Sequence, residues 1–383
     1  MKTGREEMRM KKRLERLTAL ILAGLVLMLS AGFFIVEKKV FSENENRYLA
    51  SFPHFSPERV VSGAYMEDWN SCLADHFPFR DFFVGAKTET ETALGKKEIN
   101  GVFIAEDGYL IEEYREPANT ERIAGTWRKF AGELEEGQPE PKLMLVPTAF
   151  YVYREKLPEH ALWRDQMETA QALYAASGME AIDCSRMLLT CGEENLYYRT
   201  DHHWTTLGAY QGYRVFCEKM ELEPVPLEKL ILQVVTEDFK GTLYSKSGDY
   251  SHPGEEITIY TNPADLLTVE YKDTGEITET LYNMEYAQKK DKYSLFLNNL
   301  HPLVEITNET AETDRELVLI KDSYANSMIP FLVRHFKKIY VFDTRYYKDG
   351  PSAFIAAHPG ITDVVLLYNM NTLDTDTGIR GIY

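Results

Sequence analysis

Four short apolar runs, spread between residues 143 and 367, constrain the fold more than any other feature of the sequence. They are 143–146, 317–320, 339–342 and 364–367. Each run is apolar at successive rather than alternate positions, and a strand of this kind is buried on both faces. The sequence therefore predicts a parallel sheet with helices packed on each side.

Amphipathic stretches with helical spacing separate most of these runs, as expected for a doubly wound α/β fold. The predicted helices cover 121–135, 165–176, 205–220 and 326–336. From about 221 to 314 the chain is instead rich in Thr, Tyr, Glu and Gly, with short alternating runs such as 257–260. We interpret 221–314 as a β-rich insertion that borders or covers the functional site.

The N-terminus combines a basic segment with a long apolar run. Residues 1–16 contain seven Lys or Arg against three Glu, and residues 17–36 contain no charged side chain. About 20 apolar residues suffice to cross a bilayer as a helix, and a positive flank stays in the cytoplasm. We predict a cytoplasmic segment at 1–16 and an uncleaved transmembrane anchor at 17–36. A cleaved signal peptide is the alternative, although Ser30-Ala31-Gly32 is only a weak cleavage site.

The remainder is predicted to be a linker at 37–54 and one extracytoplasmic domain at 55–383, held at the cell membrane by a single pass. The chain has 42 Lys and Arg against 60 Asp and Glu, which argues against nucleic acid as a partner. An apolar content of 44% supports a globular, enzyme-sized body. Outside the cytoplasm Cys184 and Cys191 could form a disulfide, and buried free thiols are an equal alternative.

Polar residues follow the apolar runs, at the positions where ligands bind in open parallel sheets. These residues are 147–148, 321–323, 343–345 and 368–371. Among them, Ser323 lies between a predicted buried strand and a predicted helix. A sharp turn of this kind exposes a hydroxyl group and places backbone N–H groups where they can stabilise an oxyanion.

A second candidate segment reads YRTDHHWTT and covers 198–206. Asp201 and His203 are two residues apart, so in an extended segment their side chains point to the same side. We predict a triad in which Ser323 attacks, His203 takes its proton and Asp201 holds the imidazole. His202 should then face away from the chemistry. Taken singly, each residue could instead be a cap, a packing residue or a turn residue.

The string Asp201-His202-His203-Trp204 resembles the signature of the DHHW family, within the alginate O-acetyltransferase group of SGNH-hydrolase-like acyltransferases. Other blocks are similar to the same family, namely Glu45-Asn46-Arg47 with 75–80, then 239–245, and 320–324. The resemblance implies an SGNH-hydrolase-like, doubly wound, mostly parallel sheet. It also implies that Asp201 and His203 correspond to the family's Asp-x-His pair and Ser323 to the nucleophile.

Further residues become candidates for an oxyanion hole or for substrate binding. Asn369 loosely resembles the oxyanion-hole Asn of the superfamily, Asn371 is a nearly equal candidate, and Tyr324 adjoins the nucleophile. Arg345 could clamp a carboxylate or phosphate, or pair with Asp343.

Two other positions are ambiguous. Many superfamily members have Gly before the Asp-Ser pair, where this chain has Lys321, so the close backbone approach that glycine permits is in question. The Lys321 side chain could attract an anionic group or be solvated. His301, in the insertion, could line the site or lie in a turn.

The resemblance implies an extracytoplasmic O-acetyltransferase that acts on cell-surface or exopolysaccharide hydroxyls through an acyl-serine intermediate, without a metal or cofactor. It also implies a multipass membrane O-acyltransferase as acyl donor and a polysaccharide as acceptor. The alternatives are a carbohydrate acetylesterase on the same triad and a non-catalytic polysaccharide-binding or assembly protein. A metal-dependent phosphoesterase is less favoured, because adjacent His side chains in an extended segment face opposite ways.

Overall fold

The computed structural model describes residues 2–134 and 136–382, which form two compact units. The N-terminal unit contains the chain up to Leu94 together with Gly248–Tyr250, and the sheet unit contains the remainder from Gly95 onward. This division differs from the boundary that we predicted at residue 55. Ion pairs between the predicted linker and the helices that follow it hold both in the N-terminal unit.

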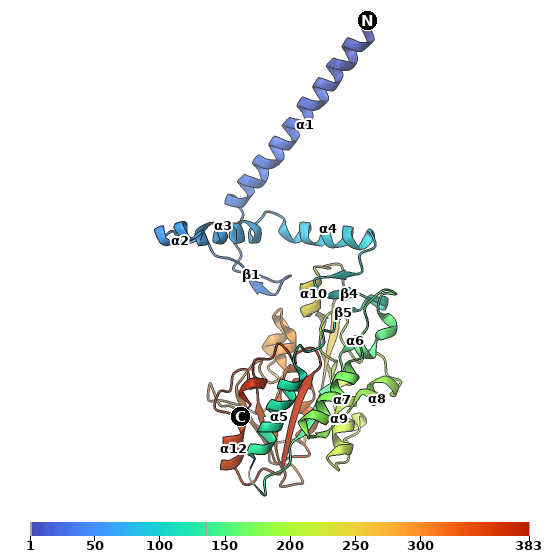
Figure 1. The fold of residues 1–383 in the computed structure, drawn as a ribbon, viewed down its shortest axis with the longest axis vertical. Coiled ribbons are helices and arrows are strands. Elements are labelled where there is room, and N and C mark those ends of the chain that lie inside the picture. The colour runs from blue at the N-terminus through green and yellow to red at the C-terminus, as the bar shows by residue number, and fades with distance from the viewer. Residues whose placement is uncertain (1, 135, 383) are drawn as a thin grey trace. The chain divides into compact units, whose positions relative to one another are not determined.

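The N-terminal unit is dominated by one long helix (Figure 1). Its elements are α1 (Lys2–Ile35), β1 (Phe41–Ser42), β2 (Arg47–Tyr48), α2 (Pro57–Ser62), α3 (Ala64–Asp75) and α4 (Arg80–Ala93). Within α1, the stretch Met8–Ile35 is long and apolar enough to cross a membrane. The helix begins in the predicted cytoplasmic segment, and the run 17–36 covers its whole second half and ends one residue beyond it. The predicted linker at 37–54 contains the antiparallel pair β1–β2.

The sheet unit is built on an eight-stranded sheet with the order β11-β10-β12-β14-β13-β15-β6-β7. The strands are β6 (Lys142–Val146), β7 (Glu180–Ala181), β10 (Leu267–Tyr271), β11 (Glu276–Thr278), β12 (Leu303–Asn308), β13 (Glu316–Lys321), β14 (Lys338–Phe342) and β15 (Asp363–Asn369). The five strands from β14 to β7 are parallel, whereas β12, β10 and β11 extend the sheet in antiparallel fashion. The predicted α/β fold with a mostly parallel sheet is therefore confirmed.

The four apolar runs are the four adjacent central strands β14, β13, β15 and β6. In β15 every residue after Asp363 is buried, so both faces of this strand are covered. The helices of the unit are α5 (Thr120–Glu133), α6 (Ala149–Val152), α7 (Gln166–Ser177), α8 (Ser185–Thr190), α9 (Thr206–Lys219), α10 (Thr242–Ser247), α11 (Ile329–Leu332) and α12 (Pro351–Ala357). Side-chain caps begin the three longest of these, with Thr205 accepting a hydrogen bond from the Gly208 N–H at the start of α9.

The predicted helix at 326–336 is wrong. The chain there forms a 3₁₀ turn, η6 (Ser323–Ser327), followed by the single turn of α11. Pro330 lies in the first turn of α11 and has no N–H to donate to the carbonyl four residues earlier. Its ring also disfavours a helical conformation in the preceding residue, so a continuous helix cannot run through this position.

The predicted insertion at 221–314 is β-rich, but it is not a separate body. β8 (Ile231–Phe239) and β9 (Glu255–Thr261) form an antiparallel pair of their own, whereas β10, β11 and β12 widen the main sheet. In β9, Ile257 and Ile259 are buried between partly exposed neighbours, which matches the alternation seen in the sequence. A small sheet of β3 (Glu98–Ile99), β4 (Val102–Ile104) and β5 (Leu110–Glu112) precedes the main one.

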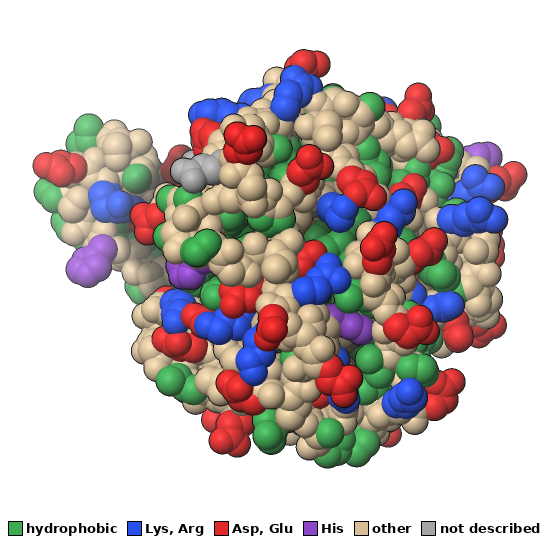
Figure 2. Space-filling view, turned by 90° about the horizontal axis from the view of Figure 1, so that it is seen from below, with side chains coloured by type: hydrophobic (Ala, Val, Ile, Leu, Met, Phe, Trp, Pro, Cys, Tyr) green, Lys and Arg blue, Asp and Glu red, His purple; other side chains and the backbone are tan. Residues whose placement is uncertain are grey.

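Acidic and basic side chains are interspersed over the face of the described residues shown in Figure 2. This face therefore has no continuous basic patch of the kind that tracks a nucleic-acid backbone. All four cysteines are free among the described residues, so the Cys184–Cys191 disulfide does not form. Those two residues flank the short helix α8.

Candidate active site

Ser323 lies in a turn at the end of the buried strand β13, and side-chain hydrogen bonds of Asp322 hold this turn. The Asp322 carboxylate accepts hydrogen bonds from the Tyr324 N–H (2.9 Å), the Asn369 N–H (2.7 Å) and the Thr372 hydroxyl (2.8 Å). Burial raises the pKa of Asp322, and these hydrogen bonds oppose that shift. The turn after β13 is thereby tied to the loop after β15, and the Ser323 side chain is left partly exposed.

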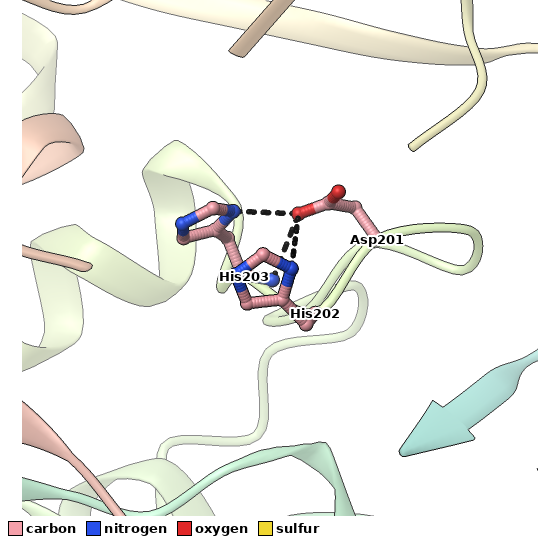
Figure 3. Close-up of side chains that lie close together, drawn as sticks. All are labelled: Asp201, His202 and His203. Carbon is pink, nitrogen blue, oxygen red and sulfur yellow. Dashed lines mark hydrogen bonds and ion pairs between the residues drawn. The ribbon is translucent and has the colours of Figure 1, made fainter. Parts of the chain in front are cut away.

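Asp201 and His203 meet through a tight turn rather than an extended segment. Asp201 Oδ1 accepts the His203 backbone N–H at 3.0 Å and also pairs with the ring Nδ1 of His203 at 2.6 Å. The first bond is the i to i+2 contact of an Asx turn. Figure 3 shows both imidazole rings turned toward the Asp201 carboxylate. The predicted Asp201–His203 contact is present, but the extended geometry that we assumed for it is wrong.

The second ring nitrogen of His203 faces the serine. His203 Nε2 lies 2.7 Å from Ser323 Oγ, although the two residues are 120 positions apart in the chain. Asp201 is 3% exposed and His203 is 5% exposed. The Tyr293 ring stacks on the imidazole at 3.7 Å with an interplanar angle of 9°, which holds the ring in plane. The three predicted residues thus form one continuous hydrogen-bonded chain.

The block at 239–245 forms the seat of Asp201. Thr242 donates to Asp201 Oδ2 from its backbone N–H at 2.8 Å and from its hydroxyl at 3.0 Å. A Cβ atom added at Gly241 would lie 2.3 Å from the Cβ of Asp201. Only glycine at this position lets the backbone approach the carboxylate so closely.

Trp204 connects the same segment to the serine turn. Its indole Nε1 donates to the Tyr324 carbonyl at 2.9 Å. The indole lies against α9, where a Cβ atom added at Gly212 would come within 2.7 Å of the ring. The Tyr324 hydroxyl donates in turn to the His202 carbonyl, so the two segments are joined twice.

The protonation states suit proton transfer at neutral pH. Burial and the neighbouring charge of His202 lower the pKa of His203 to about 4, against the opposing effect of Asp201. Burial alone would raise the pKa of Asp201, but the charges of His202 and His203 and its hydrogen bonds hold it well below its ordinary value. A neutral imidazole therefore faces the serine hydroxyl, and an ionised carboxylate stabilises the imidazolium that forms.

A cavity of about 350 Å³ lies beside the triad. It is lined by Glu112, Thr148, Ala149, Phe150, Asp201, His202, Thr242, Leu243, Lys246, Tyr324, Asn369, Asn371, Thr372 and Thr375. The Glu112 carboxylate pairs with Lys246 at 2.7 Å and accepts from Asn371 Nδ2 at 3.2 Å. Burial acts to raise the pKa of Glu112, but these contacts and the charge of His202 lower it.

His202 contradicts our prediction that it faces away from the chemistry. It lines the cavity, its Nδ1 lies 2.6 Å from the Thr242 hydroxyl, and its ring centroid is 3.9 Å from that of His203. The turn at Asp201 brings adjacent side chains to one side, which an extended strand would not do.

Of the predicted oxyanion and substrate residues, Asn369, Asn371 and Tyr324 line the cavity but are already engaged. Asn369 Nδ2 donates to Asp322 at 2.7 Å, Asn371 donates to Glu112, and the Tyr324 N–H is used by Asp322. Within the described part of the chain, no acceptor is found for the backbone N–H of Ser323. This N–H is the donor that remains available for an oxyanion.

Arg345 and Lys321 belong to a separate group that we name the strand-end cluster: Lys321, Asp343 and Arg345. Arg345 donates to both oxygens of the Asp343 carboxylate at 2.8 and 2.6 Å. Of the two roles considered for Arg345, the structure therefore shows the pairing with Asp343. Lys321 is 3% exposed, with Nζ 3.5 Å from Asp343, so the interpretation of this residue as solvated is wrong. Burial lowers the pKa of Lys321, and the Asp343 charge opposes that shift.

His301 lies in a turn of the insertion, where it pairs with Asp273 at 2.8 Å and with the Asn298 carbonyl at 3.0 Å. It does not line the cavity. Sequence reasoning missed Thr242 and Tyr293 beside the triad, and Glu112 in the cavity. Gly241-Thr242 stands in a block that resembles the family, which was a usable signal, whereas nothing in the sequence marks Tyr293 or Glu112.

A metal ion could also be considered at this site, because ligand atoms of Asp201, His202 and His203 lie within 4.8 Å of one another. Our argument that adjacent His side chains face apart is therefore wrong for this segment. The same atoms are, however, paired with each other and with Ser323 and Thr242. The cluster satisfies the geometry of a triad without an ion.

Comparison with known proteins agrees with the motif. A family model described as DHHW protein matches residues 142–342, just over half of the chain. A DHHW family protein from Eubacterium siraeum has 24% identity and a TM-score of 0.65, over 74% of this chain and 96% of that one. PatB1 from Bacillus cereus, solved with a sulfonyl adduct, has 18% identity and a TM-score of 0.61, over 74% and 98%. No curated protein matches.

The family model spans the DHHW string, the seat of Asp201, the serine turn and the strands β6, β13 and β14. The two solved structures share the fold over nearly their whole length. This protein belongs to the DHHW family.

Proposed function

We propose that this protein is a serine-dependent O-acetyltransferase that modifies carbohydrate hydroxyls through an acyl-serine intermediate. The observation that carries the proposal is the assembled chain from Asp201 Oδ1 through His203 to Ser323 Oγ, with steps of 2.6 and 2.7 Å. Both distances are those of good hydrogen bonds. This geometry also argues against a non-catalytic binding or assembly protein, for which the triad has no need.

The proposed reaction has two balanced steps. Ser323 Oγ attacks the acyl carbonyl of the donor while His203 Nε2 takes the hydroxyl proton and returns it to the leaving group. The acceptor hydroxyl then gives its proton to His203 and attacks the acyl-serine; His203 passes that proton to the departing Ser323 Oγ, which releases the ester product and free Ser323. Asp201 stays ionised throughout. This chemistry needs no metal or cofactor.

The choice of acetyl and carbohydrate rests on the resemblance to the alginate O-acetyltransferase group. The cavity is consistent with it, because Glu112, Lys246 and Asn371 offer the acceptors and donors that sugar hydroxyls require. The sulfonyl adduct is reported for PatB1. Sulfonyl reagents sulfonylate activated hydroxyl groups, so we expect one to label Ser323 here.

The proposed setting is the outer side of the cell membrane, with the apolar stretch of α1 as a single-pass anchor. Acetyl-CoA is cytosolic, so transfer outside the cytoplasm needs a second protein that carries the acyl group across. We assign that role to a multipass membrane O-acyltransferase, with a polysaccharide as final acceptor.

Ser323→Ala tests the proposal directly. The full chain in detergent should release acetate from p-nitrophenyl acetate, and the variant should lose about 10⁴-fold or more of that activity. Ser352→Ala, which changes a partly exposed serine in α12, is the matched control and should keep full activity. Equal turnover in the Ser323→Ala variant would refute the triad.

Transfer and hydrolysis are separated by the products. The protein would be incubated with an acetyl donor and candidate oligosaccharides, and the products weighed by mass spectrometry. Acetylated oligosaccharide supports the transferase. Free acetate with every acceptor would instead indicate a carbohydrate acetylesterase, because water and a sugar hydroxyl compete for the same acyl-serine.

A chelator tests the metal alternative. Because the triad needs no ion, activity should survive treatment with a strong chelator. Loss of activity that added manganese restores would favour a metal-dependent phosphoesterase at Asp201, His202 and His203 instead.

A further inference from the structure

Two sequence blocks that the proposed chemistry does not use meet in the N-terminal unit. Arg47 makes a bidentate contact with Asp75 at 2.9 and 2.5 Å, and Glu45 forms an ion pair with Arg80. The pairing with Arg47 lowers the pKa of Asp75 against the opposing effect of burial. His76 adds a contact of 2.9 Å with the Ala50 carbonyl. The turn between α3 and α4 is therefore held from both of its ends.

This turn presents aromatic side chains outward. We call Phe77, Phe79, Phe82 and Phe83 the aromatic turn. Phe79 is 69% exposed and Phe82 is 70% exposed. Phe79 has a φ of 61°, a left-handed conformation that bulky residues rarely adopt. The backbone of Phe79 begins α4, but its ring is mostly exposed, and exposed apolar rings gathered on one surface indicate a partner.

The aromatic turn lies against the C-terminal end of α1. Pro78 is buried, and a Cβ atom added at Gly32 would lie 3.1 Å from its ring. A hollow of about 340 Å³ is lined on one side by 36–39 and on the other by 75–82. If α1 crosses a bilayer, its C-terminal end is where the chain leaves the hydrocarbon, and the aromatic turn lies at that depth.

A second hollow on the same surface has the chemistry of a phospholipid site. It has a volume of about 440 Å³ and is lined by Leu73, Ala74, Phe77, Arg80, Phe83, Val84 and Lys87. Its floor is apolar and two cationic side chains stand beside it, which suits an acyl chain with its phosphate nearby. Figure 1 shows α3 and α4 running crosswise to α1, the orientation of helices that lie in a membrane surface.

We infer that the aromatic turn is a lipid-binding surface. Phe77, Phe79, Phe82 and Phe83 enter the headgroup layer at the C-terminal end of α1, and the hollow beside them takes one phospholipid. The inference rests on α1 as a membrane span and is independent of the triad. The occupant is lipid rather than protein, because the surface adjoins the span itself and combines apolar with cationic groups.

The test places a fluorophore on the full chain in vesicles of phosphatidylethanolamine and phosphatidylglycerol. Phe79→Cys carries the label in a Cys191→Ser background, because the other three native cysteines are buried. Leu25→Cys in α1 is the reference inside the bilayer. Leu266→Cys, at an exposed leucine of the sheet unit, is the reference in water.

A headgroup-nitroxide lipid should quench the label at position 79 about threefold more than the label at 266, and aqueous iodide should do the reverse. Equal quenching at 79 and 266 would overturn the inference and leave the surface to a protein partner. Failure of a second lipid, with its nitroxide on the acyl chain, to quench the label at 25 would remove α1 from the bilayer and overturn it as well. Turnover of p-nitrophenyl acetate by the same vesicles reports separately on the proposed function.

Phe79→Gly distinguishes a lipid contact from a structural role. Glycine relieves the left-handed strain, so in detergent the Tm should stay unchanged or rise. With the label moved to Phe82→Cys, lipid quenching should fall when Phe79 is replaced. A Tm loss of more than about 5 °C would show that Phe79 supports the fold, and would contradict the inference.

Discussion

The Asp201–His203 pair and the strand-end cluster each bury a carboxylate near Ser323, but the side chains that pair with the two carboxylates differ. Asp201 faces two imidazoles, and the nearer one, His203, has its pKa lowered to about 4. Asp343 faces Lys321 and Arg345, and those two charges lower its pKa although burial acts to raise it. The carboxylates are alike in exposure, at 3% and 0%. What differs is that His203 beside Asp201 is neutral and can accept a proton near neutral pH, whereas Arg345 beside Asp343 stays charged.

This difference predicts a catalytic role for Asp201 and a structural role for Asp343. A buried carboxylate beside a titratable ring can hold a proton acceptor in place and stabilise its charged form. A buried carboxylate between fixed charges neutralises them and joins the ends of adjacent strands, here β13 and β14. Removing one partner of such a cluster leaves an unpaired buried charge, so its replacement should affect stability first.

The largest expected effect is on the catalytic side. Asp201→Asn keeps the size of the side chain but no longer stabilises the imidazolium, so activity toward p-nitrophenyl acetate should fall about 10⁴-fold. The melting temperature should change little, since the amide can keep one hydrogen bond to Thr242. A variant that keeps a tenth or more of the activity would show that the pair is structural, like the strand-end cluster.

Asp343→Asn should do the opposite. It leaves Lys321 buried without its carboxylate, so the free energy of unfolding should fall by about 3 kcal/mol, measured by chemical denaturation. The folded fraction should keep nearly full turnover. Asp349→Asn, at an exposed loop position, is the control and should change stability by less than about 0.5 kcal/mol. Selective loss of turnover without loss of stability would give the strand-end cluster a catalytic role.

Gly241→Ala sharpens the comparison at the seat of Asp201. The added Cβ would lie 2.3 Å from the Asp201 Cβ and 2.4 Å from its Oδ2, so the carboxylate must move. Displacement of the triad by a fraction of an ångström should cost about 10²-fold in activity. Gly132→Ala in α5 meets no atom within 4 Å and should leave activity unchanged. Equal activity of both variants would mean that Asp201 tolerates displacement.

The smallest expected effect concerns pH. The reaction needs neutral His203, so kcat/KM should be level above about pH 5 and fall as pH drops through the pKa of about 4. The charge of His202 contributes to that low pKa, and His202→Gln should therefore shift the acid limb upward by about one pH unit. A pH–rate profile of each protein measures the shift. An unmoved acid limb would show that the charge of His202 does not contribute to the pKa of His203.

Much of the fold could be read from the sequence. A continuous apolar run of four residues has few stable places other than a covered strand, and all four such runs became adjacent strands of the sheet. The predicted helix at 326–336 is wrong because Pro330 lacks the N–H that a helix interior needs. One proline therefore prevents the helix that the apolar spacing of these eleven residues predicts.

The candidate residues of the triad could be predicted for a similar reason, since Asp201, His203 and Ser323 belong to strings with specific local chemistry. The side to which the His202 side chain points could not be predicted, because it depends on the turn that Asp201 makes with the His203 backbone. The burial of Lys321 and the stacking of Tyr293 on His203 could not be predicted either. A buried polar side chain takes its partner from whichever segment packs against it.

The sequence by itself determined the buried strands, the apolar helix at the N-terminus and the residue types of the triad, because each depends on neighbours within a few positions. Only the tertiary structure decided that His203 reaches Ser323 across 120 residues, and that Gly241-Thr242 holds Asp201. It also decided that one buried carboxylate pairs with an imidazole and the other with Lys321 and Arg345. The residue type fixes the chemistry of a side chain, and tertiary packing decides which charged or polar group lies next to it.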